Sequence, residues 1–182
     1  MVEKQIIKRC IKGDARAQKE FFMRYSPFLY NVSRRYTKNT QDAEDALQDA
    51  WINIFRNLEQ YKEEGRLEAW MKRIVINAAL SMYRKKWSSV VLTEESFELE
   101  KAFDPCIFKT LEVEDMMRYI KQLPSGYQEI FTLYVIDEFK HEEIGEMLGI
   151  GPSTSRAKLS IARKKLKAII QSSNKIYQYE AS

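Results

Sequence analysis

A cluster of acidic side chains lies between residues 42 and 49, in a stretch that contains no basic residue. Its members are Asp42, Glu44, Asp45 and Asp49, and Gln48 stands among them. On a helix, Asp45, Gln48 and Asp49 lie at positions i, i+3 and i+4 and therefore share one face. Because like charges on one face repel each other, the cluster needs an explanation. Three are open: a solvated face, a metal site made of carboxylates, or a docking surface for a basic partner.

The segment from residue 141 to residue 159 has the spacing of a helix-turn-helix. Gly149 can adopt the left-handed conformation that ends the first helix, and Gly145 is a small residue where the next helix can cross closely. Gly151 can cap the second helix, and Pro152 suits its first position because a missing N–H costs nothing there. The sequence therefore predicts two short helices joined by a tight turn.

The second of these helices is strongly basic, because no acidic residue occurs from residue 147 to residue 179. Such a helix can lie against phosphates, and the side chains near its N-terminus can reach base edges in a major groove. The residues that we predict to contact DNA are Ser153, Thr154, Ser155, Arg156, Lys158, Arg163 and Lys164. The alternative is a helical hairpin whose basic face is solvated or binds another protein.

His141 is the only histidine in the chain, and Glu142 and Glu143 follow it. A zinc site of the metalloprotease type needs a second histidine at helical spacing, so this segment predicts no such site. We expect His141 to begin a helix, with the two glutamates in its first turn, where negative charge is favourable. The sequence predicts no catalytic residue, no metal site and no cofactor.

Helices are the elements that we expect to position these residues. Six Gly and four Pro in 182 residues are few for a β protein, and the apolar residues recur with helical periodicity. The predicted helices span residues 2–12, 15–36, 40 or 42 to 58, 67–86, 113–123, 127–136, 141–148 and 152–171. The apolar stripes expected to face the core are Phe21, Phe22, Tyr25, Phe28, Leu29 and Val32 in the second helix, and Leu67, Trp70, Met71, Ile74, Val75, Ala78 and Met82 in the fourth.

The predicted fold class is all-α, with two small helical domains joined by an acidic linker. An N-terminal helical bundle covers residues 1–90, the linker covers 91–115, the helix-turn-helix domain covers 116–172, and a tail covers 173–182. Charge supports this division: residues 1–86 carry a net +7, residues 87–115 a net −6 and residues 116–182 a net +3. Two units with anionic partners, joined by a segment that must not bind those partners, give this pattern.

The cellular compartment is predicted from the cysteines and from the apolar segments. Cys10 and Cys106 form no CxxC pair, which favours a reducing environment. Charges interrupt the short apolar run at the N-terminus, and no uninterrupted apolar stretch is long enough to span a bilayer. We therefore expect a cytoplasmic protein without membrane insertion of its own.

Three segments resemble the bacterial RNA polymerase sigma factors. The stretch DAEDALQDAWI at residues 42–52 is similar to their core-polymerase-binding helix, and GRLEAWMKRIVIN at residues 65–77 is similar to the segment that recognises the minus-10 promoter element. Leu123, Pro124 and the helix-turn-helix resemble the region that reads the minus-35 element. The compact two-domain form is that of the extracytoplasmic-function (ECF) subfamily. The chain departs from the family pattern at Leu67, Ser81, Ser155 and Ile161.

The resemblance implies a function and its residues. The protein would do no chemistry itself, but would bind core RNA polymerase through Asp45, Gln48, Asp49 and Trp51. The minus-10 DNA would meet Arg66, Lys72, Arg73, Asn77, Ser81, Tyr83 and Arg84, where basic groups contact phosphates, Asn77 bonds a base and Tyr83 stacks on one. We expect Trp70 to serve the core rather than to stack on a base. The implied partners are core polymerase, promoter DNA and an anti-sigma factor, with the chain monomeric inside the holoenzyme.

Two other functions remain as alternatives. A stand-alone helix-turn-helix regulator with a helical sensing or dimerising domain would use the same C-terminal half, but it leaves the face formed by Asp45, Gln48 and Asp49 unexplained. An enzyme would use the acids at residues 42–49 to hold a metal. For the linker we expect a tether that promoter DNA repels and that follows basic channels of the polymerase.

Overall fold

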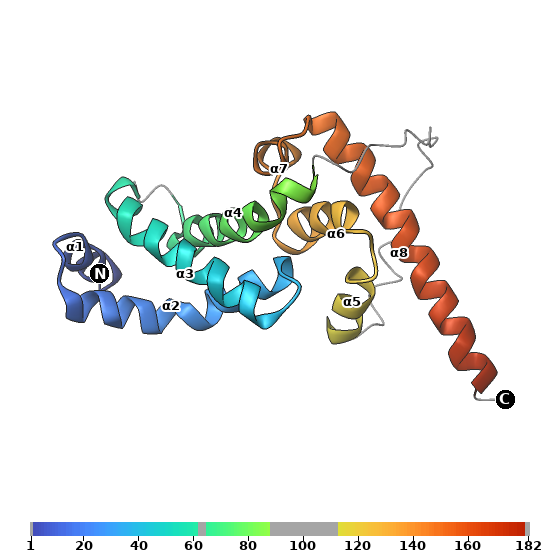
Figure 1. Ribbon diagram of the computed structural model, residues 1–182, viewed down its shortest axis with the longest axis horizontal. Coiled ribbons are helices and arrows are strands. Elements are labelled where there is room, and N and C mark those ends of the chain that lie inside the picture. The colour runs from blue at the N-terminus through green and yellow to red at the C-terminus, as the bar shows by residue number, and fades with distance from the viewer. Residues whose placement is uncertain (1, 62–64, 88–112, 181–182) are drawn as a thin grey trace. The chain divides into compact units, whose positions relative to one another are not determined.

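The computed structural model describes residues 2–61, 65–87 and 113–180, and the regular elements within these ranges are helices (Figure 1). The chain divides into two compact units, residues 1–91 and residues 92–182. The predicted acidic linker lies outside the described residues, except that the helix at its C-terminal end already begins at Val113.

The first unit contains four helices: α1 (Val2–Ile11), α2 (Ala15–Tyr36), α3 (Thr40–Asn57) and α4 (Leu67–Trp87). A 3-10 turn at Leu58–Gln60 follows α3. These bounds agree with the predicted ones to within a few residues. The side chain of Asn39 caps α3, because its oxygen accepts a hydrogen bond from the backbone N–H of Asp42 at 2.8 Å.

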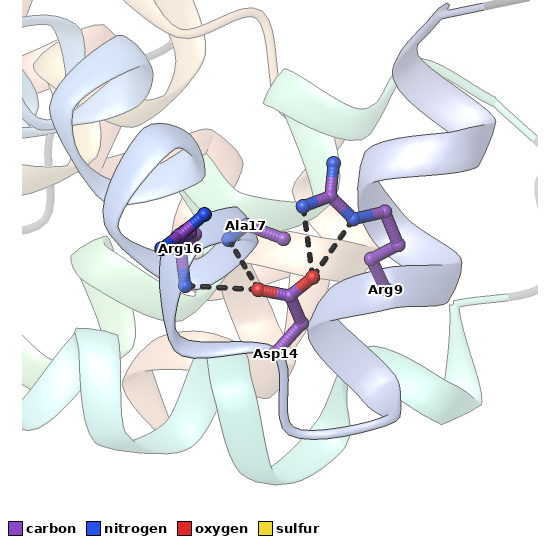
Figure 2. Close-up of polar contacts among 4 residues, drawn as sticks. All are labelled: Arg9, Asp14, Arg16 and Ala17. Atoms are coloured by element: carbon purple, nitrogen blue, oxygen red, sulfur yellow. Dashed lines mark hydrogen bonds and ion pairs between the residues drawn. The ribbon is translucent and has the colours of Figure 1, made fainter.

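One carboxylate organises the junction between α1 and α2 (Figure 2). Gly13 turns the chain with a left-handed φ of 79°. Asp14 then accepts hydrogen bonds from the backbone N–H groups of Arg16 and Ala17 at 2.9 and 3.1 Å, which caps α2. Its second oxygen receives Arg9 Nε at 2.9 Å and Nη2 at 2.8 Å. Asp14 therefore begins α2 and ties α1 to it.

The core of the first unit forms where α2 packs against α1, α3 and α4, and where α3 packs against α4 (Figure 1). The predicted apolar stripe of α2 is confirmed for Phe21, Tyr25, Leu29 and Val32, which are buried. It is wrong for Phe22 and Phe28, which are each 40% exposed. In α4 the buried face includes Leu67, Met71 and Val75 as predicted and then continues through Ile76, Ala79 and Leu80. Two helices pack against α4, so its buried face is wider than one stripe and turns away from the exposed Met82.

The second unit contains α5 (Val113–Ile120), α6 (Ser125–Phe131), a π-helical turn at Thr132–Ile136, α7 (His141–Leu148) and α8 (Pro152–Glu180). α8 packs against α5, α6 and α7. The fully buried side chains of the second unit include Ile120, Ile130, Phe131, Leu133, Ile144 and Leu166. The predicted end of the last helix at residue 171 is wrong, because α8 continues to Glu180 through most of the predicted tail.

The tight turn between α7 and α8 has the predicted form (Figure 1). Gly149 adopts the left-handed conformation with φ 69°, and the backbone N–H of Ile150 donates to the carbonyl of Gly145 at 3.0 Å. A Cβ on Gly145 would lie 2.7 Å from the carbonyl oxygen of Ile150. The close approach that requires glycine is therefore made by the backbone of the turn itself.

Candidate protein and nucleic-acid interfaces

The acidic face predicted between residues 42 and 49 exists on α3. Asp45, Gln48 and Asp49 are exposed, whereas Ala43, Ala46 and Ala50 are fully buried on the opposite side of the helix. The backbone carbonyl of Ala43 accepts a hydrogen bond from the buried Ser33 hydroxyl at 2.9 Å, which fixes α3 on α2. Small side chains on the inner side let α3 approach its neighbours closely, so the three polar side chains are presented by a firmly held helix.

Trp51 does not share this face, so the structure gives no support to its predicted contact with polymerase. The side chain is only 5% exposed and stacks on Phe55 with 5.3 Å between ring centroids. Phe22 and Phe21 lie 5.0 and 6.0 Å from the same ring. Trp51 lies three residues after Gln48 but six after Asp45, and a spacing of six does not place two side chains on one face of a helix. The Trp51 side chain points toward α2 instead. It is a core residue that supports the face from behind.

Ile52, and not Trp51, is the apolar residue on the acidic face of α3. It follows Asp45, Gln48 and Asp49 by seven, four and three residues, so it lies on their face, and it is 56% exposed. The same spacing rule that grouped the three polar residues could have found it. Ile52 thus adds exposed apolar area to the face that Asp45, Gln48 and Asp49 form.

The predicted nucleic-acid face of α4 is partly described. Asn77 and Ser81 are exposed and follow Arg73 by four and eight residues, so the three lie along one side of the helix. Lys72 lies elsewhere around the helix, and both Lys72 and Arg73 are half-buried. Arg66 is exposed just before α4. The side chains of Tyr83 and Arg84 lie outside the described part of the chain.

Two aromatic residues organise the start of α4. The Tyr61 hydroxyl donates to the carbonyl of Gly65 at 2.7 Å, and the Tyr61 and Trp70 rings lie 5.6 Å apart. Trp70 is half-buried against Tyr61, so it packs within the unit as predicted but at the edge of the core. These contacts join the segment before α4 to the first turn of the helix.

The predicted DNA-contacting side chains of α8 point in different directions. Ser153 and Arg156 are exposed near the N-terminus of the helix, and Thr154, Arg163 and Lys164 are half-buried. Burial lowers the pKa of Lys158, and the nearby carboxylate of Glu129 opposes this shift. Lys158 is half-buried. The guanidinium of Arg163 lies over the Tyr134 ring, 5.8 Å from its centroid.

Ser155 is fully buried, so the structure gives no support to its predicted contact with a base edge. Its hydroxyl oxygen lies 2.9 Å from Nδ1 of His141 at the start of α7. The His141 ring in turn stacks on Tyr134 with 4.5 Å between centroids. Ser155 faces inward because α7 crosses the first turn of α8 at this point, and a buried hydroxyl that is already bonded cannot reach DNA.

The described residues contain no group of three or more His, Cys, Asp or Glu side chains arranged to hold a metal ion. None of the described helices combines the length and the apolar character needed to cross a membrane.

Comparison with known families identifies the two units. The family model for sigma-70 region 2 matches residues 21–89, and that for sigma-70 region 4 matches residues 114–166. SigW, an ECF RNA polymerase sigma factor of Bacillus subtilis, is 27% identical over 92% of this chain and 96% of its own. The chain belongs to the ECF subfamily of RNA polymerase sigma factors. The ECF sigma-E factor of Escherichia coli is 25% identical over 94% of this sigma factor and 95% of its own length.

Solved structures share the fold of this sigma factor. RpoE of Bartonella quintana, in complex with the anti-sigma factor NepR, matches with a TM-score of 0.55 and 22% identity over 84% of this chain and 96% of that one. CnrH, in complex with the cytosolic domain of CnrY, matches with a TM-score of 0.53 and 20% identity over 92% and 96%. The predicted family and the all-α class are thus confirmed. A stand-alone regulator would not explain the match to region 2.

Proposed function

We propose that the α3 face formed by Asp45, Gln48, Asp49 and Ile52 is the surface through which this sigma factor binds core RNA polymerase. The observation that carries the proposal is the exposure of all four side chains on a helix whose opposite side is fully buried. Carboxylates attract a basic partner and favour fast association, and the exposed isoleucine adds apolar area at the centre of the contact. Gln48 contributes a side-chain amide that can both donate and accept hydrogen bonds.

DNA recognition falls to both units in this proposal. On α4, Arg73 contacts phosphates of the melted minus-10 element, and the exposed Asn77 and Ser81 on the same side bond a base or a sugar. On α8, the exposed Arg156 and Ser153 enter the major groove of the minus-35 element, and Lys164 contacts its backbone. The protein supplies specificity and orientation, and the catalytic steps belong to the polymerase.

The setting of the protein follows from these roles. It acts in the bacterial cytoplasm, where core polymerase and chromosomal DNA are found, and it is monomeric within the holoenzyme. Regulation by an anti-sigma factor is proposed because a solved protein of the same fold, RpoE of Bartonella quintana, is complexed with the anti-sigma factor NepR. An anti-sigma factor that covered the α3 face would block polymerase binding directly.

The test of core binding uses charge-neutral isosteres. The double variant Asp45→Asn/Asp49→Asn should weaken binding to purified core polymerase by about tenfold or more, because two charges at the interface are lost. Glu20→Gln is the control, since Glu20 is an exposed glutamate of the same unit that lies on α2 and not on α3. Affinity is measured by fluorescence anisotropy, and run-off transcription from selected promoters reports function. Unchanged binding by the double variant would exclude this face.

The same assays distinguish a sigma factor from a stand-alone helix-turn-helix regulator. A stand-alone regulator would bind its DNA site without polymerase and would not confer promoter-specific initiation on core enzyme. A sigma factor should instead make core polymerase produce run-off transcripts that start at one position. Core polymerase without the added protein should not produce them. Transcription that does not depend on the added protein would contradict the proposal.

A further inference from the structure

Two consecutive residues at the start of α7 contact two consecutive residues in the first turns of α8. His141 Nδ1 lies 2.9 Å from Ser155 Oγ, and Glu142 Oε1 lies 3.7 Å from Arg156 Nη1. The paired residues are fourteen positions apart in sequence, and the tight turn at Gly149 brings them together. The contacts therefore link the N-terminal end of α7 to the first turns of α8.

The His141 ring is held on two sides. It stacks on Tyr134 with 4.5 Å between centroids and 22° between ring planes. Its Nδ1 meets a hydroxyl that is fully buried. A buried hydroxyl that loses its partner is costly, so this hydrogen bond constrains the rotation of Ser155 and with it the rotation of α8 about its own axis.

The contact between Glu142 and Arg156 has a different effect. Both side chains are more than half exposed, at 67% and 57%, so the pair adds little to stability. It does bias the direction of the Arg156 side chain, which follows Ser155 directly. One contact thus orients the backbone of the helix, and the other orients the side chain that it presents to solvent.

We propose that His141 is a positioning residue for minus-35 recognition, acting through Ser155 to set the rotation of α8, and that Glu142 sets the direction of Arg156. The inference rests on the proposed role of α8 in DNA binding. Base edges are read by hydrogen bonds of defined direction, whereas phosphate contacts tolerate small displacements. Loss of the His141–Ser155 contact should therefore reduce discrimination between sequences more than total affinity for DNA.

The test compares two variants that keep different parts of the histidine. His141→Phe keeps a ring to stack on Tyr134 but removes Nδ1, and His141→Asn removes the ring but can place an amide nitrogen near the position of Nδ1. The readout is the ratio of holoenzyme affinities for a promoter with its minus-35 element and for the same DNA with that element scrambled. We expect this ratio to fall about three- to tenfold for His141→Phe and to stay within about twofold of wild type for His141→Asn.

Ser155→Ala removes the other partner of the hydrogen bond. It should lower the ratio as His141→Phe does, and the double variant should be no worse than either single one, because the same contact is lost. Glu142→Gln should also lower the ratio. Its matched control is Glu146→Gln, an exposed glutamate farther along α7, which should leave the ratio unchanged. Thermal unfolding of each variant is measured in parallel.

Two results would overturn the inference. If His141→Phe discriminates as well as wild type, the histidine only fills space. If all variants, including His141→Asn, lose discrimination in proportion to their lost thermal stability, the contact is merely structural. A wild-type holoenzyme that initiates transcription but ignores the scrambled element would instead disprove the minus-35 role of α8, and this inference with it.

Discussion

A single carboxylate, that of Asp14, both caps α2 and binds Arg9 of α1. The backbone N–H of Ala17 is the largest cause of the lowered pKa of Asp14, and the hydrogen bond from Arg9 is the next. The ionised form is therefore favoured in the folded protein. Its contribution to stability is full above the ordinary Asp pKa of 3.8 and is lost as the pH falls through the lower pKa of the folded state.

Asp14→Ala should lower the thermal midpoint of the first unit at neutral pH, because both the cap and the link to α1 are lost. The difference between variant and wild type should shrink as the pH falls below 3.8. Differential scanning calorimetry over an acidic pH series measures both effects. Glu44→Gln, an exposed acid without a capping position, is the control, and an equal loss in that variant would contradict the assignment.

His141 gives the second unit a pH dependence of the same sign as that of Asp14, but in a higher pH range near the ordinary His pKa of 6.5. Burial is the largest cause of its lowered pKa, the Arg156 and Arg163 charges act in the same direction, and Glu142 opposes them. Ser155 and Tyr134 are the neutral groups against the ring. The unfolded chain thus binds a proton more readily near pH 6.5, so the stability of this unit should decrease as the pH falls through that value.

Thermal unfolding of the second unit at about pH 7.5 and about pH 5.5 tests this dependence. Wild type should lose more stability than His141→Phe between the two conditions, since the variant has no imidazole to protonate. The first unit has no histidine and serves as an internal reference. An identical pH response in wild type and variant would show that His141 does not govern it.

At the scale of elements, the turn between α7 and α8 depends on how closely the backbone approaches Gly145. A methyl group there would lie 2.7 Å from the Ile150 carbonyl oxygen, so the turn would have to shift. At Gly151 the nearest atoms to an added Cβ are the side-chain oxygens of Ser153 and Thr154, at 3.7 and 3.8 Å. The two glycines therefore differ sharply in what they tolerate.

Gly145→Ala should destabilise the second unit by about 1–3 kcal/mol, since a forced backbone shift resembles overpacking. Gly151→Ala is the matched control and should change the stability by about 0.5 kcal/mol or less. Urea unfolding followed by circular dichroism compares them. Similar losses in both variants would mean that the close approach does not limit the turn.

The whole molecule consists of two units that each bury a core of their own. Phe21 is fully buried in the first and Phe131 is almost fully buried in the second. Phe131→Ala should therefore cost about 3–5 kcal/mol in the unfolding of residues 113–180 and leave that of the first unit nearly unchanged. Hydrogen exchange resolved by mass spectrometry reports each unit separately. Equal loss of protection in both units would show that they unfold as one.

The division of charge also belongs to the whole molecule. The net +7 block contains an acidic exception on α3, and this exception is exposed on a helix whose inner side is packed alanine. A surface that binds a basic protein is expected to be negatively charged, whereas the neighbouring surfaces that bind DNA are expected to be positively charged. The residues of this helix, together with the helix-turn-helix, suffice to predict the family.

The sequence alone determined most helix boundaries, the left-handed turn at Gly149, the acidic face of α3 and the family. Each of these depends on caps, glycines or periodicity within a few neighbouring residues, so it can be predicted locally. Only the tertiary structure decided that Trp51 and Ser155 are buried and that Ile52 is exposed. Periodicity defines a stripe, but its width depends on how many helices pack against it, and contacts such as that of His141 with Ser155 exist only after the turn has brought two helices together.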